Sequence, residues 1–311
     1  MRRKHSLTAS ATVIAAALAG CASAPTAAPP AVPDRAVITA APGSLDGVYE
    51  AGVPGSYSGI TSFASVTGTT PNVALYYSGW WEKFQAAFAA TAWSHGTYTF
   101  VQLQPAVPLE TIVRGWSDAY LRSYAAAVKA FGHPVILSFA HEMNGGWYPW
   151  GAGHVKPAVF IAAWRHVVQV FRAEGATNVT WVWTVNAVNA VNAAGSPPSQ
   201  WWPGSAWVNW VGVDGYYYRA ADTFQSVFGG TISEIREFTS APVLLSETAA
   251  GPSPRAAGQV TGLFAGIRTD HLLGLVWFDQ AQDQPPYHLD WHLADDPQAL
   301  AAFRAAAKAG T

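Results

Sequence analysis

Apolar segments of strand length recur eight times along the chain, and segments of helical character separate them. Strands that alternate with helices form parallel sheets, because each helix returns the chain to the end where the next parallel strand begins. The expected strands are 47–49, 72–77, 97–103, 134–139, 178–184, 207–213, 242–246 and 274–278. Eight such strands predict an α/β fold of the (β/α)8 or TIM barrel type.

The segments between these strands carry helix start and stop signals. The segment 157–174 opens at Pro157, in the first-turn position that proline favours, and closes before Gly175. The Ala-rich segment 118–131 has apolar residues at helical spacing and ends before Gly132. Further helices are expected at 222–238, 254–269 and 297–308. The segments 186–192 and 195–203 are expected to form a long loop with binding elements.

The composition favours one large domain that acts on an uncharged ligand. Of the 311 residues, 50% are hydrophobic and 12% are charged, so one barrel over 45–311 can bury a large core without a second domain. A net charge of −2 without basic clusters argues against nucleic acid as a partner. The 15 Trp and 12 Tyr exceed what a core needs, so some are expected to line a groove. We expect the chain to act as a monomer.

The N-terminus has the pattern of an export signal. A basic start precedes the apolar run 7–18, which is too short for an ordinary membrane span. The segment 18–21, Leu-Ala-Gly-Cys, is similar to a bacterial lipobox, so 1–21 is interpreted as a signal peptide and Cys21 as the lipidated first mature residue. The Ala/Pro-rich segment 22–44 is interpreted as a tether. The alternatives are a cell-surface lipoprotein, which touches the membrane only through this anchor, and a secreted protein.

The segment 141–151, HEMNGGWYPWG, carries the strongest chemical signal. It follows the expected fourth strand, so Glu142 arrives at the carboxyl end of a buried strand beside three aromatic residues. Sugars offer flat C–H faces that lie on aromatic rings, and cleavage of a glycosidic bond needs a carboxyl group. The simpler alternative is a surface glutamate among tryptophans that only pack. The segment therefore favours a sugar-cleaving site.

This segment resembles the acid/base region of glycoside hydrolase family 26, best known for endo-β-1,4-mannanases. The segment 241–248 is similar to the nucleophile strand of that family, 210–216 to its sixth strand and 275–279 to its eighth. The order of these motifs is more specific than any one of them. The resemblance implies a retaining mechanism with Glu142 as general acid/base and Glu247 as nucleophile, without metal or other cofactor. A structural carboxylate that caps the next helix is the alternative for Glu247.

Five further residues are candidates for substrate binding, each with a structural alternative. His141 could bond the sugar or orient the nucleophile, or it could be a buried histidine without such a role. Asn144 could shape its turn or reach a substrate hydroxyl. Trp147 and Trp277 are expected to be stacking platforms, with core packing as the alternative. The resemblance implies that Tyr216 donates to Glu247, although Tyr217 or Tyr218 could take that place.

Three functions follow from these residues. The first is an exported endo-β-glycanase that cleaves a β-linked polysaccharide, with β-1,4-mannan as the substrate that the resemblance implies. The second is a related enzyme acting on β-1,3-xylan or mixed-linkage β-glucan. The third is a carbohydrate-binding surface lipoprotein that has lost catalysis, although a pure binder has no use for both glutamates.

Overall fold

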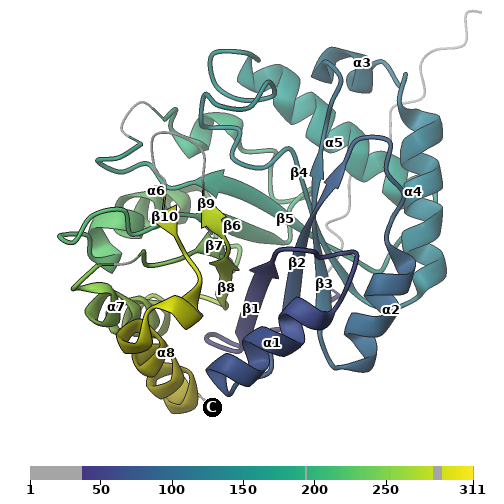
Figure 1. Ribbon diagram of the computed structural model, residues 1–311. Helices are drawn as coiled ribbons and strands as arrows, with labels where there is room; N and C mark the ends of the chain where they lie inside the picture. Colours follow the sequence, from purple (N-terminus) through teal and green to yellow (C-terminus); the bar gives the residue numbers. More distant parts are fainter. Residues whose placement is uncertain (1–36, 193–194, 252, 283–288, 311) are drawn as a thin grey trace, which may run out of the picture. The chain divides into compact units, whose positions relative to one another are not determined.

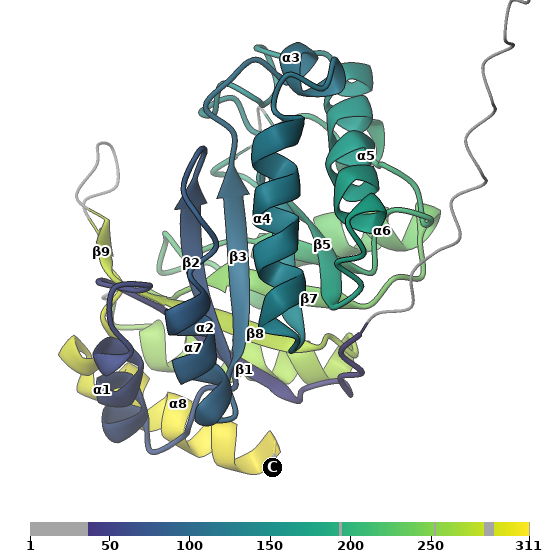
Figure 2. The same ribbon diagram turned by 90° about the vertical axis from the view of Figure 1, so that its right-hand side faces the viewer.

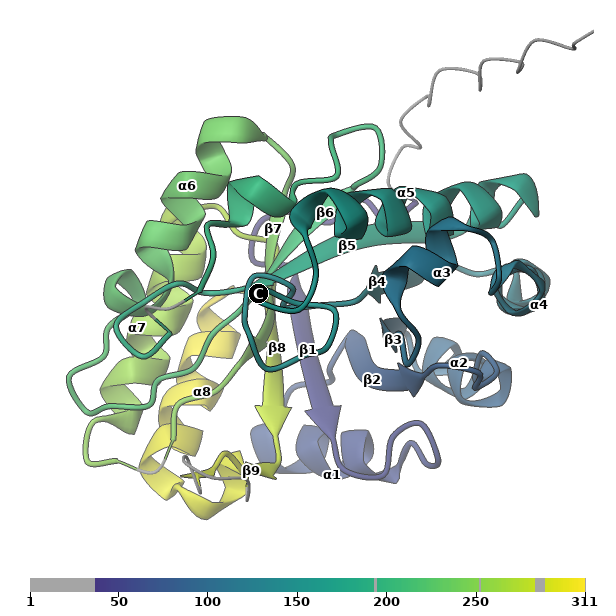
Figure 3. The same cartoon turned by 90° about the horizontal axis from the view of Figure 1, so that it is seen from above.

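Eight parallel strands close into a barrel in chain order (Figures 1 and 3). The computed structural model describes residues 37–310, apart from 193–194, 252 and 283–288. The strands are β1 (Leu45–Glu50), β2 (Val73–Gly79), β3 (Tyr98–Gln104), β4 (Val135–Phe139), β5 (Val179–Asn186), β6 (Trp210–Asp214), β7 (Val243–Thr248) and β8 (Gly274–Asp279). Each expected strand overlaps one of these. The prediction of a (β/α)8 barrel is therefore confirmed.

Helices cover the outside of the barrel (Figure 1). They are α1 (Ser58–Thr67), α2 (Ala86–Ser94), α3 (Leu109–Val113), α4 (Asp118–Phe131), α5 (Pro157–Ala173), α6 (Gly230–Phe238), α7 (Ala256–Thr269) and α8 (Pro297–Gly310). The expected helix 222–238 is partly different, because a π-helical turn, η2 (Gln225–Gly229), precedes α6. The sequence did not indicate α1, since its serines, threonines and glycine have low helix propensity.

The elements that remain are short. A 3-10 turn, η1 (Pro198–Trp201), lies in the expected loop after β5, and a second one, η3 (Leu293–Asp295), precedes α8. The two-residue strands β9 (Ala281–Gln282) and β10 (Leu289–Asp290) pair antiparallel after β8.

The barrel interior is a separate hydrophobic cluster from the layer between strands and helices. Ile38 belongs to the interior cluster, is buried, and donates its N–H to the hydroxyl of Thr180 on β5. Gly43 also bonds to the barrel, through the carbonyl of Leu272. The assignment of all of 22–44 to a tether is therefore wrong for 38–44, which are part of the folded domain.

Irregular strand pairing occurs where β7 carries Glu247. The register between β6 and β7 shifts between Gly212 and Asp214, and the register between β7 and β8 shifts between Leu245 and Thr248. A bulge of this kind bends a strand and redirects side chains, and bulges often lie next to active sites. The shift brings Asp214 opposite Glu247.

No helix within the described residues is long and apolar enough to cross a bilayer. The proposed signal peptide, Cys21 and the segment 22–36 lie outside the described residues.

Candidate active site

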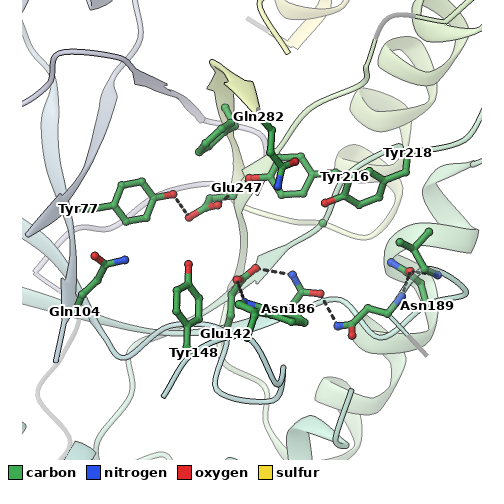
Figure 4. Close-up of a pocket in the computed structure, with 15 residues that line it drawn as sticks. Tyr77, Gln104, Glu142, Tyr148, Asn186, Asn189, Tyr216, Tyr218, Glu247 and Gln282 are labelled. Atoms are coloured by element: carbon green, nitrogen blue, oxygen red, sulfur yellow. Dashed lines mark hydrogen bonds between the residues drawn. The ribbon is translucent and has the colours of Figure 1, made fainter. Parts of the chain in front are cut away.

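A cavity of about 690 Å³ opens at the carboxyl ends of the strands, within the size range of ligand sites (Figure 4). Among the lining residues that the structure describes, none is Lys or Arg, and Glu142 and Glu247 are the ones with carboxyl groups. The side chains of both point into the cavity. The lining residues are Tyr77, Gln104, Glu142, Trp147, Tyr148, Asn186, Asn189, Val191, Asn192, Gly215, Tyr216, Tyr218, Glu247, Phe278 and Gln282.

Glu142 lies three residues after β4 in an uncommon backbone conformation. Its φ is +54°, in the left-handed region that residues other than glycine rarely adopt, and Ala140 has a φ of +49°. The N–H of Glu142 donates to the carbonyl of Thr184 on β5 at 2.9 Å. Strained backbone of this kind persists where neighbouring structure holds it, often at functional sites. The strain here aims the carboxyl group into the cavity.

Two N–H donors hold the carboxyl group of Glu142. Asn186 donates from Nδ2 to Oε1 at 2.5 Å, and Trp147 donates from Nε1 to Oε2 at 2.8 Å. The indole of Trp147 passes over Gly145, where a Cβ atom would lie only 2.2 Å from the ring. Gly145 is therefore required for space.

Two tyrosine hydroxyls hold the carboxyl group of Glu247. Tyr77 on β2 donates to Oε1 at 2.5 Å, and Tyr216 after β6 donates to Oε2 at 2.8 Å. The bond from Tyr216 is the contact that the family resemblance implies. Tyr77 comes from the opposite side of the barrel and was not among the candidate residues. Both oxygens of Glu247 therefore have a donor, and the side chain has one fixed orientation.

Burial governs the protonation of these carboxyl groups. Desolvation raises the pKa of Glu142, against the opposing effect of its bonds to Asn186 and Trp147. Desolvation and then the charge of Glu142 raise the pKa of Glu247, while Tyr77 and Tyr216 lower it. The pair therefore holds on to a proton at a higher pH than isolated carboxyl groups would.

A third carboxyl group lies beneath the pair. Asp214 is fully buried, and its Oδ1 accepts a bond from the hydroxyl of Ser246 at 2.5 Å. Burial first, and then the charges of Glu247 and Glu142, raise the pKa of Asp214 well above its ordinary value. Burial and the two neighbouring carboxyl groups therefore both disfavour the ionised form of Asp214.

Three of the candidate residues do not line the cavity. Trp277 is fully buried, packs against Phe303 of α8 and donates from Nε1 to the carbonyl of Trp291, so its assignment as a stacking platform is wrong. The reason is strand alternation: Trp277 points outward from β8, and its neighbour Phe278 lines the cavity. The aromatic side chain of β8 that lines the cavity is therefore one residue later than the sequence predicted.

His141 and Asn144 support the cavity from behind it. His141 is buried, its Nε2 lies 3.1 Å from the hydroxyl of Tyr148, and burial lowers its pKa to about 3. It is therefore a neutral support for Tyr148, which matches the alternative of a buried histidine, and its contact with a sugar stays a prediction. The side chain of Asn144 makes two hydrogen bonds to the backbone of Asn186. Its Oδ1 accepts from the N–H of Asn186 at 2.8 Å, and its Nδ2 donates to the carbonyl of Asn186 at 2.7 Å. Its amide is therefore not free for a substrate hydroxyl.

A relay of asparagines was missing from the sequence prediction. The segment 186–192 reads NAVNAVN, and its three asparagines all line the cavity. Asn192 donates to Oδ1 of Asn186 at 2.7 Å, which leaves Nδ2 of Asn186 turned toward Glu142. The period of three was the available signal, and the sequence analysis recognised only that a loop with binding elements lies here.

One group of possible metal ligands lies away from the cavity. Within the described residues, Asp290, His292 and Asp295 have ligand atoms within 4.8 Å of one another. Nδ1 of His292 lies 2.6 Å from Oδ1 of Asp290, within hydrogen-bond distance. None of the three lines the cavity.

The fold and the cavity together define a class of protein. Glu142, just after β4, and Glu247, near the end of β7, face one cavity at the mouth of a (β/α)8 barrel. Aromatic and amide side chains surround the two carboxyl groups. This arrangement is the one that glycoside hydrolases use, because both carboxyl groups must reach one glycosidic bond.

Comparison with known proteins gives the family. The model of "Glycosyl hydrolase family 26" matches residues 88–242. Endoglucanase H of Acetivibrio thermocellus is 30% identical over 277 residues, which cover 84% of this chain and 30% of that protein. The beta-1,3-xylanase TXYA of a Vibrio species is 26% identical over 208 residues, which cover 61% of this chain and 40% of that protein.

Solved structures share the fold. A Bacillus subtilis mannanase, BCman, superposes with a TM-score of 0.62 at 15% identity over 86% of each chain. The chain belongs to glycosyl hydrolase family 26. It spans less than half the length of the two curated relatives described above.

Proposed function

We propose that the protein is a retaining endo-β-glycanase in which Glu142 is the general acid/base and Glu247 is the nucleophile. The observation that carries the proposal is the different environment of the two carboxyl groups. Two phenol hydroxyls donate to Glu247, and an indole and an amide N–H donate to Glu142. Unequal environments are what separate an acid from a nucleophile in one site.

The reaction has two steps. In the first, a carboxylate oxygen of Glu247 attacks the anomeric carbon, the bond from that carbon to the leaving oxygen breaks, and Glu142 gives its proton to the leaving oxygen. In the second, Glu142 takes a proton from water as the water oxygen attacks the anomeric carbon, and the bond to Glu247 breaks. Two displacements on one carbon retain its configuration, and no cofactor takes part.

The tyrosines support this division of roles. Hydrogen bonds to the ionised form of a carboxyl group stabilise that form, and phenol hydroxyls are good donors. Tyr77 and Tyr216 therefore favour the ionised form of Glu247, against the burial and the charge of Glu142 that raise its pKa.

The substrate that we propose first is β-1,4-mannan. A second candidate is a β-glucan, because a relative that is 30% identical over 84% of this chain is named an endoglucanase. Mannose and glucose differ in the orientation of one hydroxyl at carbon 2, and a site that bonds one orientation leaves polar groups unpaired with the other. A neutral polymer suits this cavity, because its described lining residues include no Lys or Arg.

The deciding experiment measures the release of reducing ends. The purified protein is incubated with β-1,4-mannan, mixed-linkage β-glucan and β-1,3-xylan, with Glu142→Ala and Glu247→Ala as matched controls. We expect wild type to hydrolyse mannan in the middle of the chain and both variants to be inactive. Hydrolysis of glucan alone would select the second candidate. Glycan binding without hydrolysis of any polymer would instead support a carbohydrate-binding lipoprotein.

We also propose that the protein is exported, with 1–21 as signal peptide, lipid at Cys21 and the following residues up to 37 as tether. A polysaccharide is too large to enter a cell, so its hydrolase is needed outside. Cys21→Ser should move the protein from the membrane fraction to the medium, because the acyl chains lose their attachment point. A mature N-terminus elsewhere than Cys21 would contradict the lipid anchor.

We also propose that the protein is a monomer. Size-exclusion chromatography should show a monomer.

A further inference from the structure

Exposed tryptophans gather at the end of the barrel that carries the two glutamates. Six large hydrophobic side chains in the described part of the chain are more than a third exposed. Four of them, Trp81, Val113, Trp116 and Trp147, lie on segments that follow β2, β3 and β4. Trp147 belongs to the cavity, whereas Trp81 and Trp116 do not line it. Exposed aromatic surface of this kind marks binding sites.

Trp81 is held in place although it is 56% exposed. It lies in a tight turn closed by a bond from the N–H of Glu82 to the carbonyl of Gly79 and by a bond from the N–H of Gly79 to the Glu82 carboxylate. Its φ is +75°, a genuine outlier for a bulky residue. A strained backbone that presents an indole to solvent indicates that the position of the ring is useful.

Neighbouring rings fix the indole of Trp81 from one side. The ring of Tyr120, in the first turn of α4, lies edge-on at a centroid distance of 5.1 Å, and the ring of Trp80 lies at 6.0 Å. Trp80 is buried against Phe139 of β4. The exposed indole is therefore a rigid platform, and little conformational entropy would be lost when a ligand binds to it.

The turn of Trp81 lies at the rim of the cavity. Tyr77, which lines the cavity and bonds Glu247, is four residues earlier on the same segment. The last residue of β2, Gly79, pairs in the sheet with Gln104 of β3, another lining residue. A chain that leaves the cavity over β2 and β3 therefore meets Trp81 first.

Trp116 extends the same side of the rim. It is 70% exposed and lies between α3 and α4, after β3. The guanidinium of Arg114 lies 5.7 Å from the centre of its ring. In Figure 2 the segment after β2 and the segment of α3 lie at the same end of the barrel.

We propose that Trp81 and Trp116 form a glycan-binding platform outside the catalytic cavity, which holds a β-linked chain where it leaves over β2 and β3. The C–H faces of sugar rings stack on indole, and no charge on the ligand is needed. A polymer cut in its middle must cross the rim of the cavity on both sides, so its own continuation is the occupant. The inference rests on the proposed function for the identity of this occupant.

The experiment separates platform binding from catalysis. Affinity electrophoresis in gels with soluble β-mannan or β-glucan measures binding in a Glu247→Ala background, which cannot digest the gel. We expect Trp81→Ala and Trp116→Ala each to weaken binding about five- to tenfold, by the usual energy of an aromatic stacking contact. Trp93→Ala is the matched control, because Trp93 is 36% exposed at the end of α2, near the opposite end of the barrel, and stacks on His133.

Two further measurements keep the result interpretable. Trp81→Asn also removes the ring but suits left-handed backbone, so it separates loss of the platform from loss of the turn. In the active enzyme, the platform variants should lower kcat/KM on the polymer but not on an aryl glycoside that fills only the cavity. Equal mobility of the Trp81, Trp116 and Trp93 variants, or no retardation of the parent protein by either glycan, would overturn the platform. If the glycan retards the parent protein and the Trp81 and Trp116 variants are retarded less, the platform is supported. This holds even if the wild-type protein hydrolyses none of the polymers.

Discussion

The hydroxyl of Tyr77 donates to Oε1 of Glu247 at 2.5 Å, from the second strand of the barrel to the seventh. Tyr216 occupies the other oxygen of the same carboxyl group. The two phenol hydroxyls fix the orientation of the Glu247 side chain. The same two hydrogen bonds also stabilise its ionised form. The division of labour between the two glutamates depends on these hydroxyls.

The first prediction concerns the acidic limb of the pH profile. Tyr77→Phe or Tyr216→Phe removes a donor to the ionised carboxyl group, so the pKa of Glu247 should rise. A higher pH is then needed to ionise the nucleophile, and the acidic limb of kcat/KM should move up by about one unit, since a bond to a charged group contributes about 1.5–3 kcal/mol. Tyr217→Phe is the control, because Tyr217 is buried and does not line the cavity. An unmoved limb in both variants would contradict the charge assignment.

The second prediction separates the roles of the two glutamates. Glu142→Ala and Glu247→Ala should each lower kcat/KM on polysaccharide by about two to four orders of magnitude, with little change in melting temperature. Azide and an activated aryl glycoside then distinguish them. Glu142→Ala should yield the β-glycosyl azide, because the covalent intermediate still forms, and Glu247→Ala should yield the α-glycosyl azide. Interchanged products would mean that the assignment is reversed.

The barrel could be predicted because its signal is repeated and local. Eight apolar segments and the Pro157 and Gly175 boundaries of α5 depend on neighbours in the chain, and each of the eight barrel strands overlaps an expected one. Glu142 and Glu247 carried recognisable flanking motifs. Tyr216 did as well, and its bond to Glu247 follows the family pattern.

The remaining errors come from information that a sequence does not carry locally. Whether Trp277 or Phe278 faces the cavity depends on the register of β8 in the sheet. A shift of one residue in that register would move each side chain to the other face of the strand. Tyr77 and Glu247 are 170 residues apart in the chain, and only the closure of the barrel brings them into contact. The side-chain amide of Asn144 makes two hydrogen bonds to the backbone of Asn186 on the next strand. No spacing within 141–151 indicates this contact.

The third prediction compares two tryptophans. Trp147→Ala should weaken activity and leave the melting temperature nearly unchanged, because this side chain is 48% exposed in the cavity and bonds Glu142. Trp277→Ala should reduce the free energy of unfolding by roughly 3–5 kcal/mol, since it empties a space between β8 and α8. Denaturant unfolding and initial rates measure both. Equal stability of the two variants would contradict the buried position of Trp277.

The last prediction is the stereochemistry of the product. The cavity brings Glu142 and Glu247 close enough for the charge of one to raise the pKa of the other, and the side chains point into one space (Figure 4). In a retaining pair the carboxyl groups stand about 5–5.5 Å apart, and in an inverting pair about 6.5–9.5 Å, because a water must fit between the base and the sugar. We expect the retaining separation, since Glu247 is clamped by Tyr77 and Tyr216 as a fixed nucleophile. A proton NMR time course of early products should show the β anomer first and the α anomer only after mutarotation. An initial α signal would exclude Glu247 as a nucleophile even if both glutamates proved essential.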